Sequence, residues 1–210
     1  MWDASLVGLV LVLGSYVLGS LSFAVMISRM MGLADPRSFG SKNPGATNVL
    51  RSGNKKAALL TLVFDAGKGV VAVLVAQYLV AQGATREVWV AWAGVAAFFG
   101  HLYPVFFRFQ GGKGVATAAG VIFAIEPMLG LATLASFAII LYFSRMVSLA
   151  SIVAAVFAPF YLVIGNGVAW LKPGSAAMAL FLMAAWLIWR HRANIERMLK
   201  GTESRLGSKR

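Results

Sequence analysis

Residues 57–82 read AALLTLVFDAGKGVVAVLVAQYLVAQ, with Asp65 and Lys68 as the charged side chains in the run. A bilayer core about 30 Å thick needs about 20 apolar residues of helix, so this run is long enough to cross a membrane. The rest of the chain agrees, because 60% of its 210 residues are hydrophobic and only 12% are charged. A typical soluble domain has about 25% charged residues and could not hide so much apolar surface from water.

Six more apolar segments surround this run, at 4–28, 88–107, 114–125, 128–143, 147–165 and 175–190. We divide the run 114–143 at Glu126-Pro127, because proline disfavours a continuous helix there. The piece 114–125 is only about 18 Å long at 1.5 Å per residue, so it needs bilayer thinning or partial re-entry. Residues 29–56 are predicted to be a long loop, which in compact proteins is usually functional or disordered.

The basic residues predict the orientation of these segments. Seven spans place 16 of the 19 Lys and Arg residues on one face, with Arg86 and Lys172 opposite and Lys68 inside a span. Six spans would put the basic 29–56 loop and the basic tail on opposite faces. By the positive-inside rule we expect the N-terminus outside and the C-terminus in the cytoplasm. The first three residues carry no basic group, unlike a cleaved signal peptide, so we expect a retained helix.

The predicted fold class is therefore an all-α integral membrane protein with seven transmembrane segments. Residues 1–210 form a single membrane-embedded domain with a polar cytoplasmic tail at about 191–210. The net charge of +12 then mostly reflects membrane orientation, and we expect no nucleic-acid partner. The chain has no cysteine, which excludes a disulfide scaffold, a zinc-thiolate site and a cysteine nucleophile.

A first polar cluster lies in the predicted loop, at 40–51, and reads GSKNPGATNVLR. Gly and Asn favour turns with exposed backbone N–H groups, which can bind an anion. Arg51 can hold a phosphate through two parallel hydrogen bonds. The plain alternative is a polar loop of turn residues and membrane-orienting cations, and composition alone leaves the two equal.

A second cluster, at 100–117, reads GHLYPVFFRFQGGKGVAT. Its Gly-Gly-Lys opens an apolar helix, and free N–H groups at a helix N-terminus suit phosphate. It is not a nucleotide-binding P-loop, because Phe107 replaces the first glycine and Gly114 replaces Ser/Thr. A glycine turn with an interfacial lysine is the alternative. His101 is a candidate base or phosphate donor, or a structural residue.

Three smaller groups complete the candidates. Arg145 and Ser148 lie in the segment SRMVS at 144–148, where Ser148 could also simply cap a helix. His191 and Asn194 are three residues apart, so on a helix they share a face. Asp65 and Lys68 have the same spacing inside a span, either as a buried pair or with Lys68 facing an anionic substrate.

Two histidines and seven acidic residues form no close ligand cluster, so we expect no metal site and no cofactor. The alternative that a magnesium ion binds through the substrate phosphates stays open.

Together these motifs resemble the bacterial acyl-phosphate:glycerol-3-phosphate acyltransferase (PlsY) family. The resemblance covers roughly residues 14–200. It rests on four motifs in order: Gly40–Arg51, Gly100–Thr117, Val147–Ser151 and His191–Ile195. Lys42 stands where the family usually has glycine, and Arg108 and Gln110 replace its glycine and lysine. None of these departures removes a residue that we assign to the chemistry.

The resemblance implies an enzyme of the bacterial inner membrane with its active site on the cytoplasmic face. Such an enzyme moves a fatty acyl chain from acyl-phosphate to the 1-hydroxyl of glycerol 3-phosphate, forming lysophosphatidic acid and inorganic phosphate for phospholipid synthesis. Its expected partners are these two substrates, the lipid bilayer and an enzyme that supplies acyl-phosphate. The alternative is an organic-phosphate transporter or binding protein, although a transporter usually binds substrate near the midplane rather than at one face.

We expect direct attack of the hydroxyl on the acyl carbonyl, without an acyl-enzyme, with a substrate phosphate or His101 taking the proton. The expected catalytic residues are Lys113, His101, Arg51 and Ser41. The expected substrate- and phosphate-binding residues are Asn43, Thr47, Asn48, Lys68, Gly111, Gly112, Gly114, Arg145, Ser148, His191 and Asn194.

Overall fold

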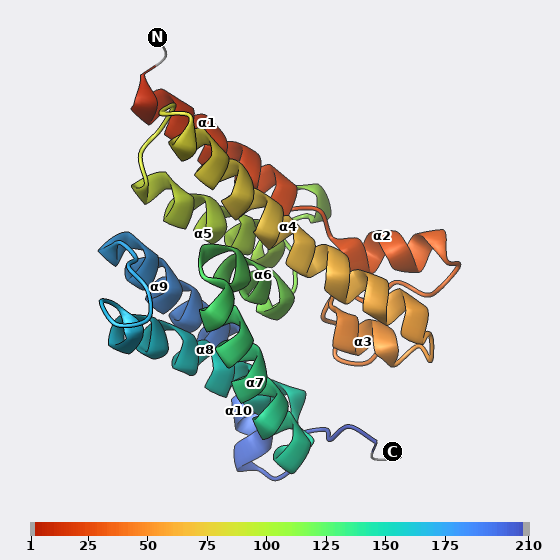
Figure 1. Cartoon of the computed structure of the whole chain (residues 1–210). Helices are drawn as coiled ribbons and strands as arrows, with labels where there is room; N and C mark the ends of the chain where they lie inside the picture. The colour runs from red at the N-terminus through yellow and green to blue at the C-terminus, as the bar shows by residue number, and fades with distance from the viewer. Residues whose placement is uncertain (1–2, 208–210) are drawn as a thin grey trace.

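The computed structural model describes residues 3–207, and every regular element in that part of the chain is a helix. The start of α1 and the helix α10 lie at opposite ends of the bundle (Figure 1). In chain order the elements are α1 (Ala4–Gly19), α2 (Phe23–Met30), α3 (Ala46–Leu50), α4 (Lys55–Ala81), α5 (Val88–Leu102), the 3₁₀ turn η1 (Val105–Phe107), α6 (Val115–Ile125), α7 (Pro127–Ser144), α8 (Val147–Gly165), α9 (Gly174–Arg190) and α10 (Arg192–Leu199). The all-helical prediction is confirmed.

The predicted continuous helix over 4–28 is wrong, because the chain bends by 41° between α1 and α2. At this break the Ser20 hydroxyl donates to Tyr16 O, a back-bond that often bends helices. The freed carbonyl of Leu21 accepts a hydrogen bond of 2.8 Å from the Lys68 ammonium. A buried cation from α4 thus satisfies a backbone group that would be costly to leave unpaired in a bilayer.

The prediction of a long loop over residues 29–56 is only partly correct. This stretch contains the end of α2, the five-residue α3 and the first residues of α4. Asn54 caps α4, since its side chain accepts the N–H of Ala57 at 2.9 Å. The predicted polar tail likewise contains α10. A search for apolar runs does not detect α3, which has five residues, or α10, which is short and polar.

The predicted division at Glu126-Pro127 is confirmed. α6 ends at Ile125 and α7 begins at Pro127, a position where proline is favoured. The Glu126 carboxylate accepts the N–H of Met128 at 3.3 Å and forms an ion pair of 3.2 Å with Lys172. The connection between α8 and α9 therefore lies beside the α6–α7 connection.

Within residues 3–207, four helical segments are long and apolar enough to cross a membrane, and the bent pair α1–α2 makes a fifth if it counts as one span. α6 and α9 are apolar but shorter, with 11 and 17 residues. Helix length therefore supports a multi-span protein. The count of seven and the orientation of the termini stay predictions.

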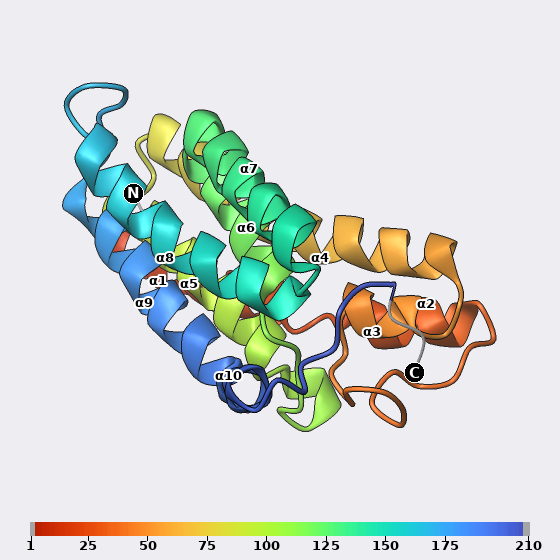
Figure 2. The same cartoon turned by 90° about the horizontal axis from the view of Figure 1, so that it is seen from below.

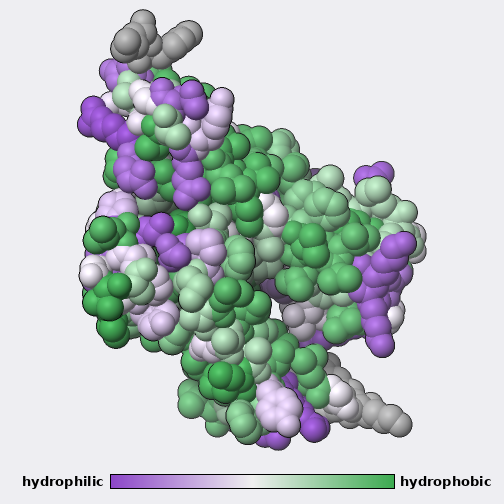
Figure 3. Space-filling view, in the orientation of Figure 1, coloured by the Kyte–Doolittle hydropathy of each residue, from purple (hydrophilic) through white to green (hydrophobic). Residues whose placement is uncertain are grey.

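Large apolar side chains cover much of the outer surface of the bundle, and Figure 3 shows them as green areas over α1, α4 and α7. Leu13 on α1 is 66% exposed, and Phe143 on α7 is 80% exposed. Apolar surface on this scale is not stable against water and fits a hydrocarbon environment.

The core of the bundle forms around α5, which packs against α1, α4, α6 and α9. Its approach to α1 depends on glycine: a Cβ on Gly19 would lie 2.2 Å from Ala97 O, and one on Gly100 would lie 2.3 Å from Tyr16 O. Small residues of this kind let membrane helices meet backbone to backbone. The contact brings the end of α5, with His101, next to the break that follows α1.

Candidate active site

Three polar segments meet at one end of the bundle, which we call the polar end. They are the connection 31–54 between α2 and α4, the connection 103–114 between α5 and α6, and the chain from His191 to Gly207. Figure 2 shows the last segment running from α10 toward α2 and α3. Segments far apart in sequence thus contribute to one site, as the predicted common face requires.

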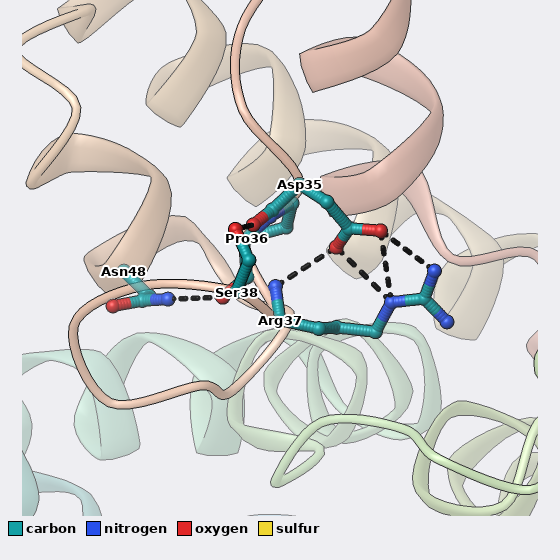
Figure 4. A network of polar contacts seen from close by, with 5 residues as sticks. All are labelled: Asp35, Pro36, Arg37, Ser38 and Asn48. Carbon is teal, nitrogen blue, oxygen red and sulfur yellow. Dashed lines mark hydrogen bonds and ion pairs between the residues drawn. The ribbon is translucent and has the colours of Figure 1, made fainter.

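The first segment is held in shape by the buried side chain of Asn48. Its Nδ2 donates to Pro36 O at 2.6 Å and to Phe39 O at 3.1 Å, while its Oδ1 accepts the N–H of Ser41 at 3.0 Å. Figure 4 shows Asn48 beside this turn, together with the Asp35–Arg37 ion pair of 2.7 Å. With its amide engaged in this way, Asn48 shapes the loop, and it leaves Ser41 exposed.

The glycine loop, Gly111–Gly114, lies against the ends of α5 and α9. The Arg190 guanidinium donates to Gly111 O at 2.9 Å and to Gly112 O at 3.0 Å, and the N–H of Gly112 donates to His101 O at 3.1 Å. A Cβ on Gly112 would lie 2.1 Å from His101 Nε2, so only glycine fits beside the imidazole. Gly114 has φ +82°, which favours glycine, and directly precedes α6.

Lys113 belongs to this loop, and its side chain reaches the C-terminal segment, where the ammonium donates to Asn194 Oδ1. Asn194 Nδ2 in turn donates to Glu203 Oε1 at 2.6 Å. The same carboxylate accepts from Ser148 Oγ at 2.7 Å and from Arg197 Nε at 2.7 Å. Lys113, Asn194 and Ser148, all predicted site residues, are therefore joined in one network.

The charges of this network act on one another. Burial lowers the pKa of Lys113 from its ordinary 10.5 to about 8; the Glu203 carboxylate opposes this shift, and neighbouring arginines add to it. Burial and the nearby Lys113 lower the pKa of His191 to about 4, so its imidazole is neutral at pH 7. Burial pushes the pKa of Glu203 upward, but hydrogen bonds from Ser148, Asn194 and Arg197 outweigh it and hold the pKa below its ordinary value.

The tail after α10 extends this network to two more predicted residues. Arg51 donates to Ser204 Oγ at 3.0 Å, and the carbonyl of Arg145 accepts the N–H of Leu206 at 2.7 Å. The side chains of Arg51 and Arg145 remain exposed. Because Lys and Arg residues in the three segments of the polar end outnumber the carboxylates Asp35, Glu196 and Glu203, the polar end suits an anion.

A second group, buried more deeply, joins α4 to α5. Asp65 Oδ1 lies 3.0 Å from Lys68 Nζ and 3.5 Å from His101 Nδ1. Of the two alternatives for Asp65 and Lys68, the structure shows the buried pair. Lys68 is engaged by Asp65 and by Leu21 O rather than facing the polar end, whereas His101 contacts the glycine loop.

The remaining predicted residues fall into two kinds. Asn43 is half-buried and Thr47 is exposed, and both belong to the first segment. His191 is buried, with its Nδ1 2.8 Å from Leu187 O, and it precedes α10, which carries Asn194. A helix cap by Ser148, weighed above as an alternative, is not formed, since its hydroxyl donates to Glu203.

Sequence reasoning missed Arg190, Arg197 and Glu203, three charged residues that hold the site together. Arg190 and Arg197 were counted as membrane-orienting charges of the tail. Glu203 was not singled out, although a carboxylate in a basic segment is a signal for an internal ion pair.

Comparison with known proteins gives a consistent result. A family model described as glycerol-3-phosphate acyltransferase matches residues 9–201. The glycerol-3-phosphate acyltransferase of Burkholderia orbicola (strain MC0-3) is 58% identical over 196 residues, 93% of this chain and 91% of the relative. That of Ralstonia pickettii (strain 12J) is 58% identical over 198 residues, 94% of this chain and 93% of the relative.

Two solved structures share the fold. The crystal structure of PlsY, an integral membrane glycerol 3-phosphate acyltransferase, in its glycerol 3-phosphate form has a TM-score of 0.86 at 39% identity, covering 95% of this chain and 96% of that one. The lysophosphatidic acid form has a TM-score of 0.85 at 38% identity, with 95% of each chain covered. These relatives are enzymes, which argues against the transporter alternative. The chain therefore belongs to the PlsY family of integral membrane glycerol-3-phosphate acyltransferases.

Proposed function

We propose that the chain transfers a fatty acyl group from an acyl-phosphate to the 1-hydroxyl of glycerol 3-phosphate, releasing inorganic phosphate and forming lysophosphatidic acid. The observation that carries the proposal is the network at the polar end. There Lys113, Asn194 and Ser148 lie together beside Arg51, at the polar end of an otherwise apolar bundle. Both substrates carry an anionic phosphate, and one carries an acyl chain, so the site must bind anions next to lipid.

The glycine loop and the first segment supply two places for phosphate. Gly111, Gly112 and Gly114 precede α6, whose N-terminal N–H groups and dipole favour an anion, and Lys113 adds a positive charge. Ser41, Asn43, Thr47 and Arg51 of the first segment hold the other phosphate. Asn48 keeps that segment in the conformation which presents them.

Glycerol 3-phosphate lies between the glycine loop and α10 in this proposal. Ser148, His191 and Asn194 hydrogen-bond its polar groups, with Arg145 at the rim. A neutral His191 with a proton on Nδ1 for Leu187 O leaves Nε2 as an acceptor for a hydroxyl. Because Ser148 and Asn194 already bind the Glu203 carboxylate, their orientation is set before substrate arrives.

The chemistry is a direct acyl transfer. The 1-hydroxyl oxygen forms a bond to the acyl carbon, the bond from that carbon to the phosphate oxygen breaks, and the hydroxyl proton passes to a substrate phosphate or to His101. Phosphate is a good leaving group, so positioning and charge neutralisation provide most of the rate. No acyl-enzyme and no cofactor take part.

An apolar groove of about 680 Å³ between α1 and α4 supports the lipid half of the proposal. Its lining includes Leu18 and Val71, which lie about one helical turn from the Lys68–Leu21 contact. From there the groove follows the outer surface of α1 and α4 toward Leu6, near the first turn of α1. We assign it to the acyl chain of the donor.

We also propose seven spans, with the N-terminus outside and the polar end at the cytoplasmic face of the bacterial inner membrane. In support, Arg51 bonds to Ser204, so the first segment and the tail lie at the same end of the bundle. The pairing of Glu126 with Lys172 brings two connections of the opposite face together. Single cysteines at Gln82 and Lys200 in the cysteine-free chain test this, since an impermeant maleimide should label only Gln82→Cys from outside.

The reaction is tested with purified protein in lipid nanodiscs and glycerol 3-phosphate. Palmitoyl phosphate, palmitoyl-CoA and palmitoyl-acyl-carrier protein are supplied in parallel, and lysophosphatidic acid and phosphate are measured. We expect product from palmitoyl phosphate alone, with no acyl-protein adduct by intact mass. Product from only a thioester donor, or an acyl adduct formed and consumed during turnover, would refute the donor or the direct transfer.

A further inference from the structure

Three buried ionisable side chains form one group where α4 meets the end of α5, and the proposed reaction gives them no role as a set. Asp65, Lys68 and His101 are only 2–7% exposed. Lys68 Nζ lies 3.0 Å from Asp65 Oδ1 and also donates to Leu21 O at 2.8 Å. The carboxylate of Asp65 therefore has its charge balanced, and Lys68 ties it to the break after α1.

The carboxylate also faces the imidazole of His101. Nδ1 of the ring lies 3.5 Å from Asp65 Oδ1. Both atoms are buried, and neither has a hydrogen-bond partner of ordinary geometry among the described residues. Since a buried polar atom without a partner is costly, we expect the two to bond to each other, with a ring hydrogen on Nδ1. Such a bond fixes the rotation of the imidazole.

The opposite edge of the imidazole lies against the backbone of the glycine loop. A Cβ on Gly112 would lie 2.1 Å from His101 Nε2 and 3.0 Å from Cε1. The N–H of Gly112 also donates to His101 O at 3.1 Å. The ring and the backbone of His101 thus contact the same residue, so the imidazole is placed to act on the loop.

Gly112 is a meeting point of the site. The same Cβ would lie 3.0 Å from Pro44 O of the first segment, and the Arg190 guanidinium at the end of α9 donates to Gly112 O at 3.0 Å. The place of Gly112 therefore sets how the glycine loop, with Lys113, lies against the first segment, with Arg51. These are the two places proposed for phosphate, and small displacements of binding groups are costly in acyl transfer.

We propose that Asp65 is a positioning residue of the glycine loop: by bonding to Nδ1 it holds the His101 imidazole against Gly112 and so fixes the loop relative to the first segment. Lys68 balances the carboxylate and ties the group to the break after α1. This inference rests on the proposed function. The imidazole then takes no proton in the reaction, and the hydroxyl proton passes to a substrate phosphate.

A matched pair of substitutions separates the hydrogen bond from the bulk of the ring. The amide nitrogen of asparagine can take the place of Nδ1, whereas that of glutamine takes the place of Nε2 and leaves Asp65 without its donor. We expect His101→Asn to keep KM for glycerol 3-phosphate within about 3-fold and His101→Gln to raise it about 10-fold, as loss of one buried hydrogen bond does. In both variants kcat should change less than about 3-fold, because the binding of substrate and transition state is weakened alike.

Gly112→Ala tests the contact between the ring and the loop. The added methyl group would overlap Nε2, so this variant should raise KM for glycerol 3-phosphate about 10-fold. In the His101→Asn background the shorter side chain leaves room, and the same substitution should raise KM less than about 3-fold. Thr61→Val, a buried change one turn before Asp65 on α4, is the control and should leave KM and kcat unaltered.

The unmodified protein provides a test that does not depend on how any variant folds. The chain has only two histidines, so ¹⁵N-histidine labelling gives two rings, and His101→Asn assigns the signals. We expect His101 to carry hydrogen on Nδ1 near pH 7. A ring with hydrogen on Nε2 alone has no donor for Asp65 and would overturn the proposal.

Three kinetic results would also overturn it. These are a smaller KM effect for His101→Gln than for His101→Asn, a loss of kcat with KM unchanged, and effects of Gly112→Ala and His101→Asn that multiply. Failure of the proposed function looks different, because the unmodified protein then forms no lysophosphatidic acid from acyl-phosphate. Hydrogen exchange of residues 103–114 should still be faster in His101→Gln than in His101→Asn, and equal exchange in the two variants would count against positioning.

Discussion

Raising the pH from 7 to 9 should remove the positive charge of Lys113 and weaken phosphate binding at the glycine loop. Burial lowers the pKa of this lysine to about 8. Because the pKa is lowered, the charged form predominates below pH 8 and is lost above it. The charged fraction falls from about nine-tenths at pH 7 to about one-tenth at pH 9.

The assay is kcat/KM for glycerol 3-phosphate in nanodiscs, since this parameter reports ionisation of the free enzyme. A phosphate monoester has its second pKa near 6, so the substrate stays dianionic over this range. We therefore expect kcat/KM to fall about 10-fold between pH 7 and 9. The parameter kcat should fall less, because a bound phosphate keeps Lys113 charged.

Lys113→Arg isolates the cause. A guanidinium stays charged at pH 9, so the variant should lose the pH dependence of kcat/KM. Its longer side chain disturbs the contact with Asn194 and should lower activity at pH 7 by about 10-fold. Lys172→Arg, at the opposite end of the bundle, is the matched control and should keep the unmodified profile. An equal decline in Lys113→Arg, or a flat profile in the unmodified enzyme, would refute the reasoning.

Three further substitutions test the framework of the site. Arg190→Ala removes the donor to two carbonyls of the glycine loop and should raise KM for glycerol 3-phosphate about 10-fold. The control is Arg192→Ala, at an exposed neighbour stacked on a tryptophan, which should leave this KM unchanged. Equal KM values in the two variants would contradict the role assigned to Arg190. Glu203→Ala leaves Ser148, Asn194 and Arg197 without their acceptor and should lower the stability of the fold by about 1–3 kcal/mol, measured by thermal unfolding. Glu196→Ala removes an exposed carboxylate and should change the unfolding temperature little. Gly14→Phe should fill the α1–α4 groove, where a Cβ meets no atom within 4 Å, and shift donor preference from long to short acyl-phosphates; an unchanged chain-length profile would remove the groove from the account.

The helices of the fold could be predicted well from apolar length and from Glu126-Pro127. The bend after α1 could not, because it depends on Lys68, 47 residues away, taking the carbonyl of Leu21. α3 and α10 were missed because both are short, and an isolated helix of that length is not stable without its packing partners.

The site could be predicted at the level of which segments meet, because the positive-inside rule places the basic loops on one face. It could not be predicted which side chains bind one another. Asn48 carries the chemistry of a ligand yet is engaged within its own loop, and His101 looks solitary in sequence yet faces Asp65 of another helix. Such pairings depend on how each helix is rotated about its axis relative to its neighbours, and residue spacing within one helix does not predict that rotation.

The most direct measurement of the central claim is a time course of lysophosphatidic acid and phosphate from palmitoyl phosphate and glycerol 3-phosphate, for the unmodified protein beside Lys113→Ala in nanodiscs. We expect the unmodified enzyme to form both products in equal amounts and the folded variant to form almost none. Phosphate without lysophosphatidic acid, or a variant as active as the unmodified enzyme, would contradict acyl transfer at this site.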